Sequence, residues 1–172
     1  PRLPRKEILF ALKPVLEDEN VGKYLHEAKP AIAALTSEGI HLAGVTFDTM
    51  IASYLINPSR HSHDLDGLSL EHLGSRLLSR RDAMGSGAKT PPLSFQPMDI
   101  QRATQVACQE AEFTFRLTRK LAPMLKELEL EQLFSQIELP LIGVLADMER
   151  HGVKVDGEFL GEMSKELEVK LE

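Results

Sequence analysis

The sequence predicts a mostly α-helical fold with two short strands. Apolar residues recur at helical spacing through most of the 172 residues. Strand character is confined to residues around 22–27 and to residues 44–47, where β-branched and aromatic side chains follow a glycine. Two strands are too few for an independently stable sheet. We therefore expect helices to supply most of the core.

Composition indicates one ordinary domain in a reducing compartment. The chain is 42% hydrophobic and 27% charged, which suffices for one core. It has no apolar run near the roughly 20 residues that cross a bilayer, and residues 1–6 lack the apolar stretch of a secretory signal. The single cysteine, Cys108, cannot form an internal disulfide, and we expect a buried thiol rather than a nucleophile. A cytoplasmic location without membrane contact follows.

The first half of the chain contains several residues that typically start or end helices. A helix is expected after Pro4, and a small Ala-rich helix over residues 28–37 should end at Gly39 in the left-handed conformation. Asp48 should cap a further helix that follows the second strand. Asn57 and Pro58 should stop that helix. The strands and their helices therefore alternate.

The middle of the chain changes in composition. Residues 59–67 are polar and turn-like, and residues 68–78 form a leucine-rich helical stripe. A mobile loop is predicted at about 79–97, where almost nothing can be buried. Asp99 should then cap a long helix that ends or bends at Pro123. This long helix is the largest predicted element.

The last third is helical again. Residues 128–148 carry a helical pattern with Pro140 as a kink. Residues 152–156 interrupt it, and residues 157–172 are amphipathic. No repeat of fixed period is visible, which argues against a solenoid.

The charge of the whole chain does not favour nucleic-acid binding. Its formal net charge is -6, so a phosphate backbone is not attracted to it overall. A modest basic stretch contains Arg76, Arg80, Arg81 and Lys89 around a Gly/Ser segment. We interpret this stretch as a solvated loop. Any contact with DNA must come from elsewhere or be local.

Two histidines and two aspartates lie close together in the polar turn. His61, His63, Asp64 and Asp66 are residue types that suit Zn²⁺. They lack a cysteine or further histidine at ligand spacing, so a solvated turn is the favoured interpretation and a zinc site the alternative.

Three segments share one resemblance. Residues 38–55 read EGIHLAGVTFDTMIASYL, residues 61–74 end in LDGLSLEHLG, and residues 137–156 run from IELPL to MERHGVKVD. In order and spacing they resemble family A DNA polymerases of the DNA polymerase I type, which serve DNA replication and repair. The resemblance implies a truncated α/β RNase H-like, 3′ to 5′ exonuclease-like domain over residues 1–136. Residues 137–172 would form a linker helix and the start of the polymerase thumb.

The resemblance also implies where exonuclease chemistry would lie. Such enzymes hydrolyse phosphodiesters with two metal ions about 4 Å apart, held by several acids. The first acidic pair would precede Pro1. The second acidic position falls at Glu27 or Ala28, and an expected Tyr and Asp on the long helix fall at Val106 and Glu110. Valine lacks the tyrosine hydroxyl, and glutamate is one methylene longer than aspartate.

These differences predict an inactive, scaffold-like exonuclease domain. We expect no catalytic residue, cofactor or metal in this segment, with Mg²⁺, DNA and template-directed synthesis left to the rest of the polymerase chain. Exposed strand edges lead us to expect homodimerisation of the isolated segment. Two alternatives stay open: an active two-metal exonuclease of the RNase D type, and a non-enzymatic helical interaction module unrelated to polymerases.

Overall fold

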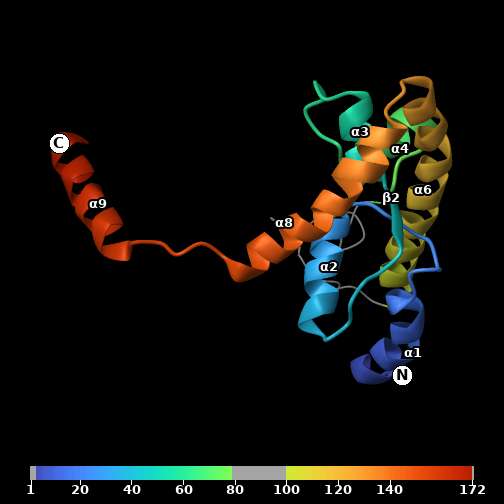
Figure 1. Ribbon diagram of the computed structural model, residues 1–172, viewed down its shortest axis with the longest axis horizontal. Coiled ribbons are helices and arrows are strands. Elements are labelled where there is room, and N and C mark those ends of the chain that lie inside the picture. Colours follow the sequence, from blue (N-terminus) through green and yellow to red (C-terminus); the bar gives the residue numbers. More distant parts are fainter. Residues whose placement is uncertain (1–2, 79–99, 172) are drawn as a thin grey trace.

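The computed structural model describes residues 3–78 and 100–171 (Figure 1). Along the chain, the elements are α1 (Arg5–Glu17), β1 (Lys23–Leu25), α2 (Ala28–Ser37), β2 (Val45–Asp48), α3 (Thr49–Ile56), α4 (Leu65–Leu73), α6 (Ile100–Glu127), α7 (Glu131–Leu133), the π-helical turn η1 (Phe134–Glu138), α8 (Leu139–His151) and α9 (Gly157–Leu171). The predicted fold class, mostly helical with two short strands, is confirmed.

The strands β1 and β2 form a parallel pair, and α2 is the crossover between them. Tyr24 is paired with Phe47 and Leu25 with Asp48, with an irregular step after Lys23. Helix α6 packs against β1, whereas α8 contacts β2. The helices thus cover a sheet that two strands alone could not stabilise.

The core lies between α3, α4, α6 and η1. Its buried apolar side chains are Phe47, Ala52, Leu68, Leu117, Leu121, Leu125 and Phe134. The rings of Phe47 and Phe134 lie 4.8 Å apart between centroids, which joins the end of the sheet to the π-helical turn. Fully burying a leucine side chain contributes about 1.5–3 kcal/mol. The leucines of α6 therefore dominate the hydrophobic stabilisation of this core.

The predicted caps at the end of α2 and at the start of α3 are confirmed. Gly39 has φ 72°, the left-handed conformation expected after α2. The Asp48 side chain accepts hydrogen bonds from the backbone N–H groups of Met50 and Ile51 and so caps α3. Helix α3 ends before Asn57, as expected. Local hydrogen-bond chemistry alone specifies these boundaries.

The predicted boundaries of the next helix were wrong. Helix α4 begins three residues before Leu68, because the Asp64 carboxylate accepts a hydrogen bond from the Gly67 N–H and caps the helix earlier. It ends at Leu73, since Gly74 adopts φ 65°. The predicted loop at 79–97 and the cap at Asp99 lie outside the described residues.

Of the two outcomes expected at Pro123, an end or a bend of the long helix, an end is wrong. Helix α6 continues to Glu127 with Pro123 inside it. Leu121 and Leu125, on either side of the proline, are 0% and 1% exposed. Their burial compensates for the backbone hydrogen bond that proline cannot donate.

Helix α8 leads out of the core along α2. The predicted helical pattern over 128–148 is interrupted by η1, which runs directly into α8, where Pro140 is the second residue. Ile142 and Ala146 are buried, and the α8 face that carries them packs on α2. The Lys29 Nζ donates a hydrogen bond of 2.6 Å to Glu149 Oε1 across this contact.

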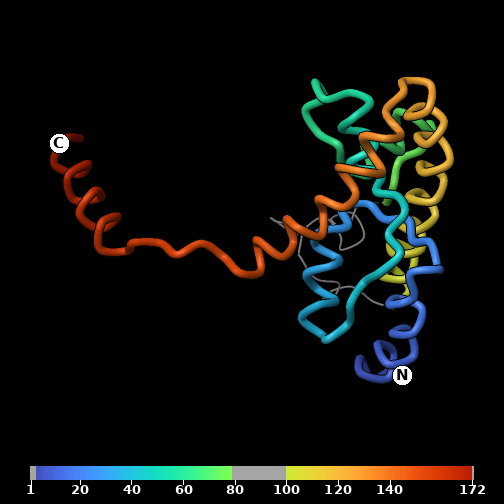
Figure 2. The backbone as a smooth tube through the Cα atoms, in the orientation of Figure 1, coloured from blue at the N-terminus to red at the C-terminus, as the bar shows by residue number. Residues whose placement is uncertain are grey.

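Helix α9 stands apart from the rest of the chain. Figures 1 and 2 show it beyond an extended segment that follows Gly152. Every described residue of α9 is exposed. Within residues 3–78 and 100–171, no helix has both the length and the apolar character needed to span a bilayer.

Candidate functional site

The junction of β1 and α2 is held by one buried aspartate. Asp48 is 1% exposed, and its Oδ2 accepts a hydrogen bond of 2.7 Å from the Ala28 N–H while Oδ1 caps α3. One carboxylate therefore joins the start of α2 to the start of α3. Glu27 precedes this junction with φ 57°, and its side chain is exposed. The left-handed backbone at Glu27 is what turns the chain from β1 into α2.

His26 lies behind Glu27 and is half-buried. Its Nδ1 is 2.9 Å from the Thr49 Oγ1, at the first residue of α3. Burial lowers the pKa of His26 below the ordinary histidine value, since the charged form loses solvation. Nearby carboxylates oppose this shift in the order Asp48, Glu27, Asp64 and Glu110. The neutral imidazole is therefore favoured in a surrounding of acids.

Helix α6 forms the opposite wall. Glu110 is half-buried, and its backbone carbonyl accepts a hydrogen bond of 2.7 Å from the Thr114 hydroxyl. Val106, one turn earlier, is 1% exposed and faces the core. The long helix thus presents a carboxylate to the site and buries the aliphatic side chain that stands in place of a tyrosine.

Asp64 closes the third side. Hydrogen bonds from the Ser62 hydroxyl and then from the Gly67 N–H lower its pKa, because they stabilise the carboxylate. Asp64 is thereby an ionised helix cap whose position is set by the start of α4.

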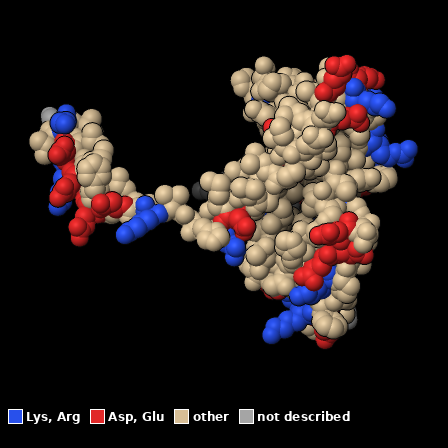
Figure 3. All heavy atoms as spheres, in the orientation of Figure 1, with Lys and Arg blue, Asp and Glu red and all other residues tan. Residues whose placement is uncertain are grey.

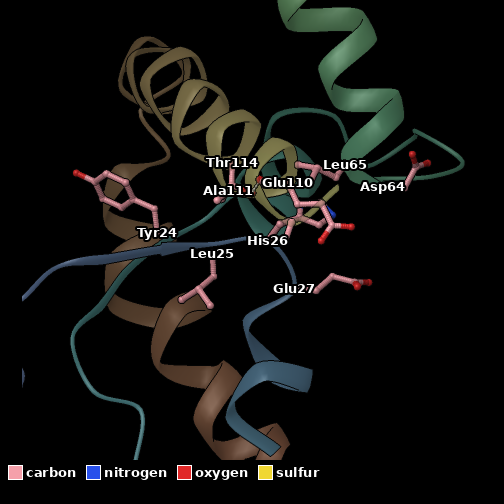
Figure 4. Close-up of a pocket in the computed structure, with 10 residues that line it drawn as sticks. Tyr24, Leu25, His26, Glu27, Asp64, Leu65, Glu110, Ala111 and Thr114 are labelled. Atoms are coloured by element: carbon pink, nitrogen blue, oxygen red, sulfur yellow. Dashed lines mark hydrogen bonds between the residues drawn. The ribbon is translucent and has the colours of Figure 1, made fainter. Parts of the chain in front are cut away.

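These elements enclose a hollow of about 540 Å³. Its lining consists of Tyr24, Leu25, His26, Glu27, Asp64, Leu65, Ala107, Glu110, Ala111 and Thr114. In the view of Figure 4, the three carboxylates lie on one side of the hollow and the Tyr24 ring on the other. The Tyr24 ring is 6.1 Å from the Phe115 ring between centroids and is half-exposed.

The carboxylates of the hollow do not form a metal site of the kind that two-metal exonucleases need. Within residues 3–78 and 100–171, no three His, Cys, Asp or Glu side chains are grouped closely enough to hold one. None of the described residues that line the hollow is Lys or Arg. The hollow can accept protons and hydrogen bonds, but it offers no positive charge to a phosphodiester.

The structure brings together two of the four predicted exonuclease-motif positions. Glu27 and Glu110 line the same hollow, whereas Ala28 is fully buried and Val106 faces the core. Sequence reasoning placed neither His26 nor Asp64 there. His26 directly precedes Glu27, so its position next to a predicted motif residue could have assigned it to the same site.

The polar turn supplies structural hydrogen bonds. His63 Nδ1 lies 2.9 Å from the hydroxyl of Ser53, which is buried in α3. Asp66 Oδ1 accepts a hydrogen bond of 2.9 Å from the Leu77 N–H. His61 is exposed. The side chains of the suggested zinc site thus contact different parts of the chain.

Cys108 was expected to be buried, and this was wrong. The thiol is exposed on α6. Cys108 is two positions after buried Val106, and two positions on a helix correspond to a rotation of about 200°, to the opposite face.

The comparisons with known proteins agree with the resemblance in the sequence. Residues 5–113 match the family model described as DNA polymerase I, ribonuclease H-like domain. DNA polymerase I of Pseudomonas aeruginosa is 39% identical over 173 residues, and that of Rhizobium leguminosarum is 36% identical over 166. The match covers 99% and 96% of this chain, but only 19% and 16% of the relatives.

A solved structure gives the same result. It is described as the POL domain of Pol1 from M. smegmatis in complex with DNA primer-template and dNTP. The TM-score is 0.74 at 30% identity, and the match covers 96% of this chain and 25% of that one. The chain thus spans about a fifth to a quarter of the polymerases it matches, and the alternative of a helical module unrelated to polymerases is wrong. With an RNase H-like match over most of its length and polymerase relatives over nearly all of it, this chain belongs to the DNA polymerase I, ribonuclease H-like domain family.

Proposed function

We propose that this chain is a polymerase segment whose exonuclease-like domain is catalytically inactive and serves as a scaffold. The observation that carries the proposal is the donor set of the hollow. Glu27, Asp64 and Glu110 face one space, yet the described residues form no group of three metal donors. Two-metal hydrolysis needs such a group at each ion.

The replacement at Val106 supports the same conclusion. Its side chain is packed in the core and has no hydroxyl to orient an attacking water. The absence of lysine and arginine among the described lining residues adds a repulsive environment for phosphate. The hollow therefore has carboxylates where a nuclease site would have them, but its described residues lack the metal-donor group that hydrolysis would need, and Val106 lacks the hydroxyl.

The scaffold role is supported by the packing of α8. This helix contacts both α2 and β2. These contacts fix its orientation relative to the domain body, and α8 therefore sets the point from which the chain continues to α9. Its contact with α2 combines buried Ile142 and Ala146 with the Lys29–Glu149 ion pair. In a complete polymerase, template-directed DNA synthesis, its Mg²⁺ ions and most DNA contacts would belong to regions outside this segment, which α8 and α9 would help to orient.

The test of inactivity uses 5′-labelled single-stranded DNA with Mg²⁺ or Mn²⁺. We expect no shortening above a protein-free blank, and no saturable Mn²⁺ binding by calorimetry. Glu110→Gln removes a carboxylate of the hollow, whereas Glu112→Gln removes an exposed one on the same helix and is the matched control. Trimming that Glu110→Gln abolishes and Glu112→Gln preserves would establish the active two-metal exonuclease instead.

The alternative of an active exonuclease is kept for a specific reason. Three carboxylates do line one hollow, and rotamer changes of glutamates move their oxygen atoms by ångströms. Since a misplacement of about 1 Å can cost on the order of a hundredfold in rate, weak trimming is the signature to look for. The Mn²⁺ arm of the assay is the sensitive one.

We also propose that isolated segments associate through strand edges. Within the described residues, β1 and β2 pair only with each other, so each strand has one edge without a strand partner. Such edges favour pairing with a second chain. Light scattering on a concentration series tests this: a mass that rises with concentration is expected, and a constant monomer mass contradicts it.

A further inference from the structure

Helix α8 has a second apolar face, about 120° around the helix from the one that packs on α2. This outer stripe consists of Leu141, Val144, Leu145 and Met148, which are 39%, 54%, 39% and 62% exposed. Their spacing of three and four residues places them on one side of the helix. A hollow of about 620 Å³ lies along Val144, Leu145, Met148 and Val153. In Figure 3, the region that α8 crosses carries few charged side chains.

Helix α9 carries a matching feature. The α9 stripe consists of Leu160, Met163, Leu167 and Leu171, all exposed. Charged side chains occupy the other faces, including Glu158, Glu162 and Lys165. Every described residue of α9 is exposed, so the stripe is uncovered in this arrangement. Most helical stability in proteins comes from packing of an apolar face, so a surface that covered the stripe would stabilise α9.

The geometry of the connection points to α8 as that surface. The linker 152–156 has five residues, which is within the usual length for a hairpin of two antiparallel helices. Gly152 already has φ 70°, a conformation that suits a reversal of the chain. From Leu141 to Met148 and from Leu160 to Leu167 the chain advances seven residues, or about 10.5 Å of helix in each case.

We propose that α9 exchanges between the open arrangement and a closed strap folded back on α8, and that the closed strap is the more populated of the two when no other protein surface covers the outer stripe. In the antiparallel hairpin, Leu160 lies opposite Met148, and Leu167 lies opposite Leu141. The structure holds the open arrangement, with α9 apart from the body (Figure 1). The closed strap removes both stripes from water and leaves the charged faces of α9 in solvent. This inference concerns the segment alone and does not depend on the proposed loss of nuclease activity.

Disulfide trapping tests the strap directly. In a Cys108→Ser background, Val144→Cys is combined with Met163→Cys, which the hairpin places within one residue of facing each other. The matched control combines Val144→Cys with Val169→Cys, because Val169 is 76% exposed and lies on the opposite side of α9. Both pairs share the same linker, and they differ in helix face and in a distance of about 9 Å along α9. All the substituted positions are exposed, and circular dichroism checks that the variants keep the fold.

The expected result is an intramolecular disulfide between positions 144 and 163 that forms at least about tenfold faster than the 144–169 disulfide, since cysteines with distant Cα atoms cannot be bridged. Met148→Glu places a charge in the closed interface and should slow the 144–163 reaction on the order of tenfold. Hydrogen exchange of α9 in the otherwise unmodified chain should be slowed, and Met148→Glu should release it.

Three results would overturn the proposal. The first is equal rates for the two cysteine pairs. The second is a 144–163 disulfide that joins two chains, which assigns the stripe to a second copy. The third is α9 amide exchange at unprotected rates in the chain without cysteine substitutions.

Discussion

Asp48 joins two helices through one buried carboxylate, and its replacement tests how the body of the domain is held together. In Asp48→Ala, the N–H groups of Met50 and Ile51 lose their cap, and the Ala28 N–H loses the carboxylate acceptor at 2.7 Å. Ala28 is 0% exposed, so water cannot replace the lost acceptor without opening the structure. The two losses are separable because they involve different oxygen atoms.

The magnitude follows from these two contributions. Loss of an N-cap costs about 0.5–2 kcal/mol. Leaving a buried donor unsatisfied costs about 1–3 kcal/mol. We therefore expect Asp48→Ala to lower the free energy of unfolding by about 1.5–5 kcal/mol, the sum of the two ranges. Asp48→Asn keeps one carbonyl oxygen for α3 but turns an amide donor toward Ala28, so its cost should lie between that of alanine and zero.

Asp64→Ala is the matched control, because Asp64 caps α4 at an exposed position through the Gly67 N–H. Its cost should be that of a cap alone, about 0.5–2 kcal/mol. Urea unfolding followed by far-ultraviolet circular dichroism measures both variants, with an unchanged m-value as the check on two-state behaviour. If Asp48→Ala costs no more than Asp64→Ala, the bond to Ala28 contributes nothing and the reasoning is refuted.

Three further predictions concern other positions. Since burial lowers the pKa of His26, its stabilising effect is complete above about pH 6.5 and is lost as the pH falls toward the lowered value; His26→Asn should flatten this part of a urea-midpoint series against pH. Gly44→Ala should cost about 3 kcal/mol or more, because its Cβ would lie 2.6 Å from a backbone carbonyl oxygen, whereas Gly74→Ala, with similar φ and open space, should cost about 1–2 kcal/mol; thermal unfolding compares the two. Phe134→Ala should cost about 3–5 kcal/mol in the same urea experiment, and a cost below 1 kcal/mol would mean that η1 is not anchored by this ring.

Features that depend on neighbouring residues could be predicted from the sequence. The cap at Asp48 and the left-handed Gly39 follow from local hydrogen bonding and backbone sterics, and both were found. Features that depend on distant packing could not. Pro123 signals a helix end by its chemistry, yet buried leucines on both sides carry the helix through it. For Cys108, a pattern of small and apolar neighbours did not resolve which face of α6 meets the core.

The candidate site also contains residues that could be predicted from the sequence and residues that could not. The family resemblance pointed to Glu27 and Glu110, and the fold brings both to one hollow although they are far apart in the chain. Asp64 could not be assigned to that hollow from the sequence. Its position depends on where α4 begins and on how α4 packs against α6, and both are tertiary facts. Periodicity identifies helices, but it does not say which of their ends meet.

The π-helical turn at Phe134–Glu138 has a consequence for the evolution of this segment. A π turn takes up one residue more than an α turn, and one residue corresponds to about 100° of rotation about a helix axis. The extra residue is accommodated within the turn, so deleting one residue there would convert it to regular α-helix and leave Ala146 facing α2, whereas the same deletion within α8 before Ala146 would rotate Ala146 away from α2. Single-residue deletions should therefore be better tolerated in this turn than within α8, and this turn is where the chain can change its length without changing the direction in which it leaves the domain.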